Sequence, residues 1–453
     1  MSGLRLPVPR PGRMAAAAAV AATLAVAGCG SGNASGGGSG GGSGGGSGST
    51  AKGASLTIAD VAPFTGTDAA LGPTYLVSCD AATNAINSAG GVLGHSLKCK
   101  SVDTRGDPAD AVPAVRQMYA STSNLALVIG CTSDEAASVV PLFGANKTIS
   151  FCMTGQSEFD HVKFPYFYRL VPPDLSESYA MVAMAQQRHY KRIALAFGND
   201  IGSQTFVAPA IAAIKKAGMT LVANKTLDLN ANTFRTEAAA IAAAKPDVIM
   251  TEALGPTEAA FLSEVKQLNN GKMIPVIGTS ATISPDWYKS VAAAVGGATL
   301  ASNFAADNLV VETSGPAYQP FASAINAEKG KVGSTGNFST YLTAPGAVHL
   351  YDGINLAALA MLASHSTNSS KIGPFIQQIG DGVPGAKVVY SFAQGAAALK
   401  AGQKIRYEGP GGPTNFDAYH DSTGLFQVDK YTPNGGVKVV GNLSTSQLRA
   451  LGL

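Results

Sequence analysis

The sequence lacks the residue spacings that usually carry catalysis, metal binding or phosphate binding. Its six histidines are scattered without the spacing of a metal site: His95, His161, His189, His349, His365 and His420. Residues 155–159 lack the second glycine of a nucleophile elbow, and residues 144–148 lack the glycine pattern of a phosphate-binding loop. We therefore expect no enzymatic site, no metal and no cofactor.

The sequence after the N-terminal region also lacks a net charge. The formal net charge is +3, and Arg5, Arg10 and Arg13 account for it. The remainder is close to neutral and so lacks the basic surface that binds nucleic acid. After the N-terminal region, no apolar run is long and uniform enough to predict a membrane-spanning helix.

The first 28 residues have the features of a secretory signal. An apolar run follows the arginines at residues 14–27, shorter than the about 20 residues that a bilayer needs. The run ends in Val26-Ala27-Gly28-Cys29, which is typical of a lipobox, in which Cys29 is lipidated and becomes the new N-terminus. The alternative is an ordinary signal with a chance cysteine. Residues 29–53, mostly glycine and serine, are predicted to form a flexible tether to the membrane.

Four cysteines remain when Cys29 is set aside: Cys79, Cys99, Cys131 and Cys152. An even number in an exported chain suggests disulfide bonds, and four cysteines allow three pairings. Four buried free thiols are the alternative. From the residues alone, all three pairings stay open.

After the tether, strand-like and helix-like segments alternate in two series. Strands are predicted at 55–61, 96–103, 125–130 and 148–153, then at 192–197, 220–227, 247–252 and 273–279. Helices are predicted at 75–87, 109–120 and 134–144, then at 205–218, 234–244 and 258–268, and later at 347–363. A hairpin is predicted from 425–431 and 436–440. Such alternation predicts two lobes, each with a parallel sheet covered by helices on both faces.

Several short motifs, each with a different sequence, lie at or near the ends of these predicted strands and helices. They are Pro63-Phe64-Thr65-Gly66 after the first strand, INSAGGVLG at 86–94, DTRGDP at 103–108, Val128-Ile129-Gly130, Tyr351-Asp352 and Phe416-Asp417. In this order and spacing, over residues 55–440, the chain resembles the type I periplasmic binding proteins of the leucine/isoleucine/valine-binding family.

The resemblance implies an α/β fold of two doubly wound parallel-sheet lobes joined by three crossings. The first lobe would hold residues 54–173 and 304–413, and the second lobe residues 174–303 and 414–453. On this fold the resemblance favours the disulfide pairs Cys79–Cys99 and Cys131–Cys152, whose members lie on neighbouring elements. It also implies a monomer in the cell envelope, outside the cytoplasm, that passes a small molecule to the permease and ATPase subunits of an ABC importer.

The resemblance places the ligand between the lobes, at the carboxyl ends of the strands. In the first lobe it points to Thr132, Ser133 and Asp134. The family has a serine at the position of Asp134 that binds a ligand carboxylate, which an aspartate would repel. Alternatively, Asp134 caps the following helix, and Thr132 or Ser133 contacts the ligand.

A second loop of the first lobe, Gly155-Gln156-Ser157, would contact the ligand through backbone N–H groups and the Ser157 hydroxyl. The alternative is that Ser157 only caps the next helix. Gln156 is larger than the family's usual alanine, so it would narrow the pocket or add an amide to it.

The second lobe would contribute Ile201, Glu252, Leu254 and Ser280. Ile201 stands where the family often has a tyrosine that stacks over the ligand, and Ser280 stands where amino-acid binders place a glutamate for the ligand's ammonium group. Glu252 would replace that charge, or it is a solvated or capping residue. Because the amino-acid pattern is incomplete, the ligand class stays open among amino acid, amide, urea, polyamine and aromatic acid.

The sequence therefore predicts a lipid-anchored binding protein of an ABC importer that captures a small amino-acid-like or amide-like ligand. The alternative is a ligand-sensing lipoprotein of the same fold that acts with a membrane signalling partner. Permease and ATPase genes beside this one would favour transport, and a kinase gene would favour sensing.

Overall fold

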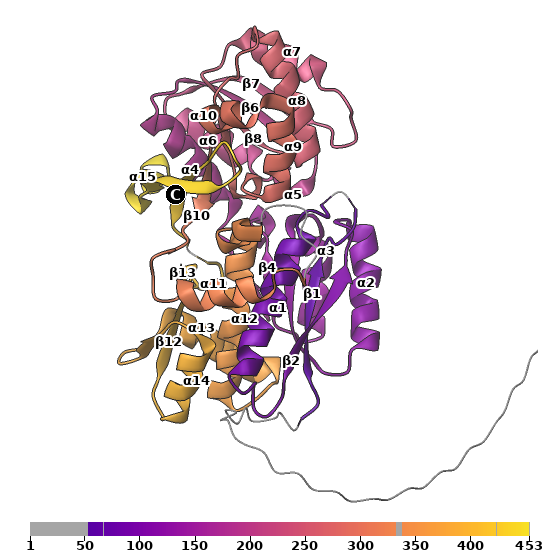
Figure 1. The fold of residues 1–453 in the computed structure, drawn as a ribbon, viewed down its shortest axis with the longest axis vertical. Helices are drawn as coiled ribbons and strands as arrows, with labels where there is room; N and C mark the ends of the chain where they lie inside the picture. Colours follow the sequence, from indigo (N-terminus) through magenta and orange to yellow (C-terminus); the bar gives the residue numbers. More distant parts are fainter. Residues whose placement is uncertain (1–52, 67, 332–337, 423, 453) are drawn as a thin grey trace, which may run out of the picture. The chain divides into compact units, whose positions relative to one another are not determined.

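The structure is a computed structural model that describes residues 53–452 except 67, 332–337 and 423. Within these residues the chain builds two α/β lobes (Figure 1). The predicted signal, the lipidation site Cys29 and nearly all of the predicted tether lie outside the described residues.

The sheet of the first lobe has five parallel strands in the order β2-β1-β3-β4-β5. The strands are β1 Leu56–Ala62, β2 Leu97–Asp103, β3 Leu125–Thr132, β4 Ser150–Met153 and β5 Phe167–Arg169. Helices α1 Gly72–Ser88 and α12 Pro345–Ser364 cover one face, and α2 Pro108–Ser121 and α3 Ser133–Ala145 cover the other (Figure 1). Every residue of β1 is buried, as expected for a strand between two layers of helices.

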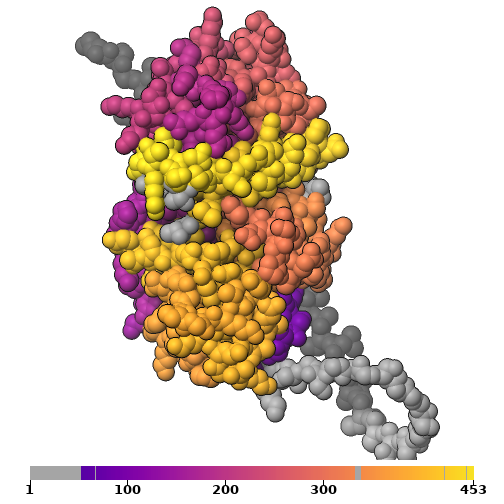
Figure 2. All heavy atoms as spheres, turned by 90° about the vertical axis from the view of Figure 1, so that its left-hand side faces the viewer, coloured from indigo at the N-terminus to yellow at the C-terminus, as the bar shows by residue number. Residues whose placement is uncertain are grey.

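The sheet of the second lobe has seven strands in the order β15-β14-β10-β9-β8-β6-β7, of which β14 and β15 are antiparallel to their neighbours. The strands are β6 Arg192–Gly198, β7 Thr220–Leu227, β8 Val248–Glu252, β9 Val276–Gly278, β10 Phe304–Leu309, β14 Phe426–Tyr431 and β15 Val437–Leu443. The helices are α4 Asp174–Gln187, α5 Ile201–Gln204, α6 Val207–Lys216, α7 Arg235–Ala244, α8 Gly255–Leu268, α9 Pro285–Val295, α10 Gly297–Asn303 and α15 Thr445–Leu451. The C-terminal segment is yellow in Figure 2, where it lies against the magenta and salmon atoms of this lobe.

Both parallel sheets have the same strand order, because β7-β6-β8-β9-β10 repeats β2-β1-β3-β4-β5. In such a sheet the loops after the central pair of strands turn to opposite faces and leave a crevice at the carboxyl ends. The central pairs are β1 with β3 and β6 with β8. Each lobe therefore brings one crevice to the site described below.

The chain passes between the lobes three times, so the predicted fold of two doubly wound lobes joined by three crossings is confirmed. The crossings lie at 170–173, 310–317 and 414–425. Strand β10 pairs with β9, so the second sheet continues past residue 303, where we expected the chain to leave it. The first lobe also holds α11 Tyr318–Ala327, α13 Ser369–Asp381, α14 Phe392–Lys400 and the small sheet β11 Lys387–Val389, β12 Ile405–Gly409 and β13 Gly412–Pro413.

Helix α12 has the length and apolar composition of a membrane-spanning helix, with a mean hydropathy of 1.2 over its most apolar window. However, 78% of that window is buried inside the protein, where it packs in the core of the first lobe. Burial within the protein therefore accounts for the composition of this helix.

Two further sequence predictions concern local structure. The structure contains both expected disulfides: Cys79–Cys99 joins α1 to β2, and Cys131–Cys152 joins β3 to β4. The helix predicted at 205–218 is present as α6, and the short helix α5 that precedes it was not predicted. Thr205, which follows α5, donates its hydroxyl to the carbonyl of Gly202 (2.6 Å) and to the carboxylate of Asp174 (2.5 Å), a contact that joins this turn to α4.

Candidate functional site

A cavity of about 380 Å³ lies between the lobes, where the carboxyl ends of the parallel strands of both sheets meet. This volume is within the range of small-molecule sites, which is about 300–1,000 Å³. Seven of the ten predicted site residues line it: Thr132, Ser133, Asp134, Gly155, Glu252, Leu254 and Ser280. The remaining three, Gln156, Ser157 and Ile201, are not among its lining residues.

Asp134 links the two lobes. The residue that precedes α3 as its N-cap is Thr132, which donates its hydroxyl and its N–H to the carboxylate of Glu135 (2.5 and 3.0 Å). The alternative prediction that Asp134 caps α3 is therefore wrong. One carboxylate oxygen of Asp134 instead accepts the backbone N–H groups of Ile201 (3.0 Å) and Gly202 (3.2 Å), in α5 of the other lobe.

The Asp134→Ala variant tests this link. We expect it to remove about 1–3 kcal/mol of contact between the lobes, so that small-angle X-ray scattering shows a larger radius of gyration for the ligand-free variant. Glu158→Gln, which changes an exposed carboxylate outside the cavity, is the control. Identical scattering from Asp134→Ala and the unchanged protein would show that the bond does not hold the lobes together.

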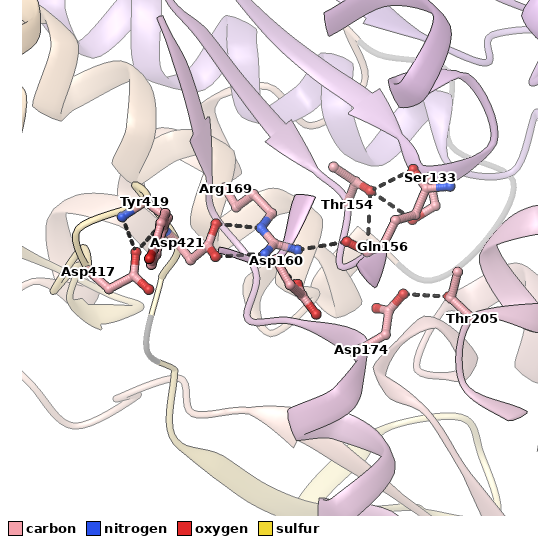
Figure 3. Close-up of polar contacts among 10 residues, drawn as sticks. All are labelled: Ser133, Thr154, Gln156, Asp160, Arg169, Asp174, Thr205, Asp417, Tyr419 and Asp421. Carbon is pink, nitrogen blue, oxygen red and sulfur yellow. Dashed lines mark hydrogen bonds and ion pairs between the residues drawn. The ribbon is translucent and has the colours of Figure 1, made fainter. Parts of the chain in front are cut away.

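The side chain of Gln156 bonds to Thr154 in its own loop (Figure 3) and is not among the residues that line the cavity. Ser133 donates its hydroxyl to the Thr154 hydroxyl (3.1 Å), which donates in turn to the amide oxygen of Gln156 (3.3 Å). Gln156 is thereby buried inside its own loop, and the expected narrowing of the pocket by its side chain is wrong. Ser157 is exposed at the start of the short 3-10 helix η1 Ser157–Phe159, outside the cavity.

Gly155 lines the cavity, and a residue with a side chain would not fit at this position. A Cβ atom at this position would lie 1.9 Å from Oδ1 of Asp174. The Gly155 carbonyl accepts the backbone N–H of Asp174 (2.8 Å). The close approach of these two backbones sets Asp174, the first residue of α4, beside the loop.

A carboxylate lies beside Ser280, but Ser280 does not supply it. The backbone N–H of Ser280 donates to Oε1 of Glu177 in α4 (2.6 Å), and the Thr279 hydroxyl donates to Glu252. The carboxyl group that amino-acid binders place at position 280 thus has counterparts in Glu177 and Glu252, which lie beside this position. Ile201, in contrast, is 46% exposed and only its backbone N–H takes part, through the bond to Asp134.

Eight acidic or aromatic residues that line the cavity were not predicted from the sequence. They are Asp68, Tyr75, Asp174, Glu177, Asp200, Phe206, Asp286 and Trp287. The signal that the sequence offers for Asp174 and Glu177 is their spacing of three residues, which puts both on one face of α4. Nothing in the sequence alone predicted that this turn faces the cavity.

Burial raises the pKa values of Asp68, Asp174 and Glu252, and the charges of neighbouring carboxylates add to the effect. Burial raises the pKa of Asp68 to about 8, helped by the neighbouring charge of Asp134. Burial also raises the pKa of Asp174 to about 8, although the bond from Thr205 opposes the shift. The pKa of Glu252 is raised well above its usual range, first by burial and then by the charge of Glu177. These three groups therefore favour the protonated, uncharged form in the folded protein.

Solved structures of known proteins share the two-lobed fold of this chain. Leucine-binding protein LivK from Thermotoga maritima is 18% identical, with 86% of this chain and 99% of that chain covered and a TM-score of 0.68. A solute-binding protein from R. palustris in complex with benzoate is 16% identical (86% and 96% covered, TM-score 0.65). A fatty acid ABC transporter substrate-binding protein from Thermomonospora curvata is 15% identical (87% and 94% covered, TM-score 0.68). At these identities the structural likeness shows the fold.

No curated protein sequence matches the chain. The sequence profile of a family described as periplasmic binding protein matches residues 55–424, which is most of the chain. The resemblance inferred from the turn motifs is thus confirmed. The chain belongs to the periplasmic binding protein family, whose structural neighbours here are type I binding proteins of ABC transporters.

Proposed function

We propose that this chain is the solute-binding component of an ABC importer, and that it carries a small amino-acid-like or amide-like molecule to a permease and its ATPase. The observation that carries the proposal is the cavity of about 380 Å³ between the lobes. It lies where two crevices of the same strand order face each other, so side chains of both lobes would contact one ligand.

Closure of the lobes on the ligand supplies the signal that a permease recognises. Residues from the loops after β3 and β8 would contact the ligand together only when the lobes are close, so bound ligand stabilises that arrangement. Asp134 adds a bond between the lobes that does not involve the ligand. The expected role of the ligand is to add to this bond and shift the population further toward closure.

A cross-linking experiment in the producing cells tests the proposed function. We expect the protein to cross-link to a permease subunit, and expect an ATPase subunit to be recovered with that permease. Recovery of a membrane kinase instead would support the sensing alternative and contradict the importer.

We further propose that Cys29 carries the lipid that holds the protein outside the membrane, which the sequence Val26-Ala27-Gly28-Cys29 supports. Replacing Cys29 by serine is expected to move the protein from the membrane fraction to the soluble fraction, because the acyl chains supply the anchor. Fractionation followed by immunoblotting measures this. The Ser31→Ala variant, which changes a residue of the predicted tether, should stay with the membrane. Retention of Cys29→Ser on the membrane would contradict the lipid anchor.

A further inference from the structure

The cavity between the lobes is lined by ionisable side chains of one sign. Seven carboxylic acids line it, contributed by both lobes: Asp68, Asp134, Asp174, Glu177, Asp200, Glu252 and Asp286. Among the described residues that line the cavity, none is lysine, arginine or histidine. The described lining of the cavity itself therefore supplies no positively charged side chain to balance them.

Several of these carboxylic acids are buried without a counter-ion. Asp68, Asp174 and Glu177 are each less than a tenth exposed. Oδ2 of Asp200, which lines the cavity, is buried and has no hydrogen-bond partner among the described residues. The fully buried Asp307 lies near Glu177, and the charge of Glu177 adds to burial in raising the pKa of Asp307. Buried carboxylates of this kind are unfavourable unless a donor or cation pairs with them.

Three backbone N–H groups at or next to the cavity are already occupied by the protein's own carboxylates. Asp134 accepts the N–H groups of Ile201 and Gly202 at the start of α5. Glu177 accepts the N–H of Ser280, in the loop after β9. Because the protein's own carboxylates take these donors, a ligand carboxylate would meet negative charge where a binding site for anions needs free N–H groups.

The cavity walls also suit an organic cation with an apolar part. Tyr75, Phe206 and Trp287 line the cavity, and aromatic faces attract ammonium and guanidinium groups. Trp287 is held in place by the bond from its indole N–H to the carbonyl of Ala253 (3.2 Å). Across the described residues, no group of three or more His, Cys, Asp or Glu side chains is arranged to hold a metal ion. The carboxylic acids are spread along the walls of a cavity and do not converge on a point.

We propose that the ligand is a small organic cation, with an ammonium, amidinium or guanidinium group and no free carboxylate. This inference rests on the proposed function and concerns the same cavity. It separates the chain from its structural neighbours, whose names record leucine, benzoate and a fatty acid as ligands. An amino-acid amide fits the class, because it keeps the amino-acid skeleton and replaces the carboxylate by an uncharged group.

Isothermal titration calorimetry of the purified full chain tests the proposal with probes that share one skeleton. Leucinamide is a cation, leucine a zwitterion and N-acetyl-leucinamide is uncharged; benzylamine and benzoate form a second pair. We expect leucinamide and benzylamine to bind at least about tenfold more tightly than leucine, N-acetyl-leucinamide and benzoate. Tighter or equal binding of leucine, benzoate or the uncharged amide would overturn the cation proposal and leave the proposed solute-binding function standing.

Single substitutions test whether the carboxylic acids of the cavity are the groups that bind the cation. Glu177→Gln keeps an acceptor for the Ser280 N–H but removes one negative charge, so we expect it to weaken cation binding roughly tenfold or more. Glu252→Gln is the second variant in case Glu177→Gln does not fold, and the exposed Glu158→Gln is the matched control. Unchanged cation affinity in both cavity variants would overturn the proposal. Absence of binding by every probe would also overturn the cation proposal. The proposed importer function would be contradicted as well only if cross-linking also recovers no permease.

Discussion

Replacing Arg169 by methionine is expected to lower the free energy of unfolding by about 3–5 kcal/mol. Arg169 is fully buried, and its guanidinium donates to both carboxylate oxygens of Asp421 (2.6 and 2.7 Å) and to Asp160 (2.6 Å) (Figure 3). It also donates to the carbonyl of Gln156 (3.1 Å). Without the guanidinium, two carboxylates would lie close together with no counter-ion, a costly arrangement away from water.

The Arg169 guanidinium joins two segments that are far apart in the sequence, so its loss should lower the stability of the whole protein. Arg169 ends β5, just before the first crossing, and Asp421 lies in the third crossing. Equilibrium unfolding in urea measures the effect. Arg116→Met, which changes an exposed arginine of α2, is the control and should cost little. A loss below about 1 kcal/mol in Arg169→Met would show that the ion pairs contribute no more than a surface pair.

Raising the pH from about 6.5 to about 8 is expected to lower the free energy of unfolding of the ligand-free protein by about 2 kcal/mol for each of Asp68 and Asp174. In the folded protein burial raises both pKa values to about 8, whereas an unfolded aspartate titrates near 3.8. Between these values the folded state binds protons that the unfolded state has lost. The stability that these protons supply is therefore present at low pH and is lost as the pH rises through the folded pKa.

The range begins at about 6.5 because of His349, whose pKa burial lowers to about 4. Below the usual histidine pKa of 6.5, the unfolded state gains a proton there that the folded state does not, which lowers stability at acid pH. Above that pH its contribution is constant. The slope that remains then reports the buried carboxylic acids.

Thermal unfolding at several pH values checks this prediction, with Asp68→Asn as the test variant. Asp68 faces Asp134, Asp200 and Glu135, all of them acidic, so asparagine should remove one source of repulsion and flatten the slope. Glu158→Gln should leave the slope as it is, because that carboxylate is exposed. Stability that stays constant or rises between these pH values would contradict the raised pKa values.

The fold could be predicted because its signals are local. Alternating apolar strands and helices, with glycine-rich turns between them, specify parallel sheets without knowledge of distant contacts. The strands at 192–197 and 220–227 are examples, since the structure has β6 Arg192–Gly198 and β7 Thr220–Leu227. A short element whose contacts come from far away is missed by the local pattern, as α5 was, beside which Asp134 and Asp174 bond to Ile201 and Thr205.

The site could be predicted only in part, for a related reason. The loops that follow β3 and β8 were found because the carboxyl ends of parallel strands form such sites. Glu177 was missed because it lies 103 residues before its partner Ser280, in a helix that leads out of a crossing. The cap predicted for Asp134 was wrong because Thr132 and Glu135 already satisfy the start of α3, which frees Asp134 to bond across the lobes.

Native mass spectrometry of the full chain, purified from the cells that produce it, tests the central claim that the cavity between the lobes holds a small molecule. The account predicts one small molecule per chain in the unchanged protein and none in Leu254→Trp, because Leu254 lines the cavity and an indole there would fill it. Identification of the released molecule from its accurate mass and fragmentation would then show whether it contains a basic group and lacks a carboxylate. Retention of the same molecule by Leu254→Trp would place the binding site elsewhere and contradict the account.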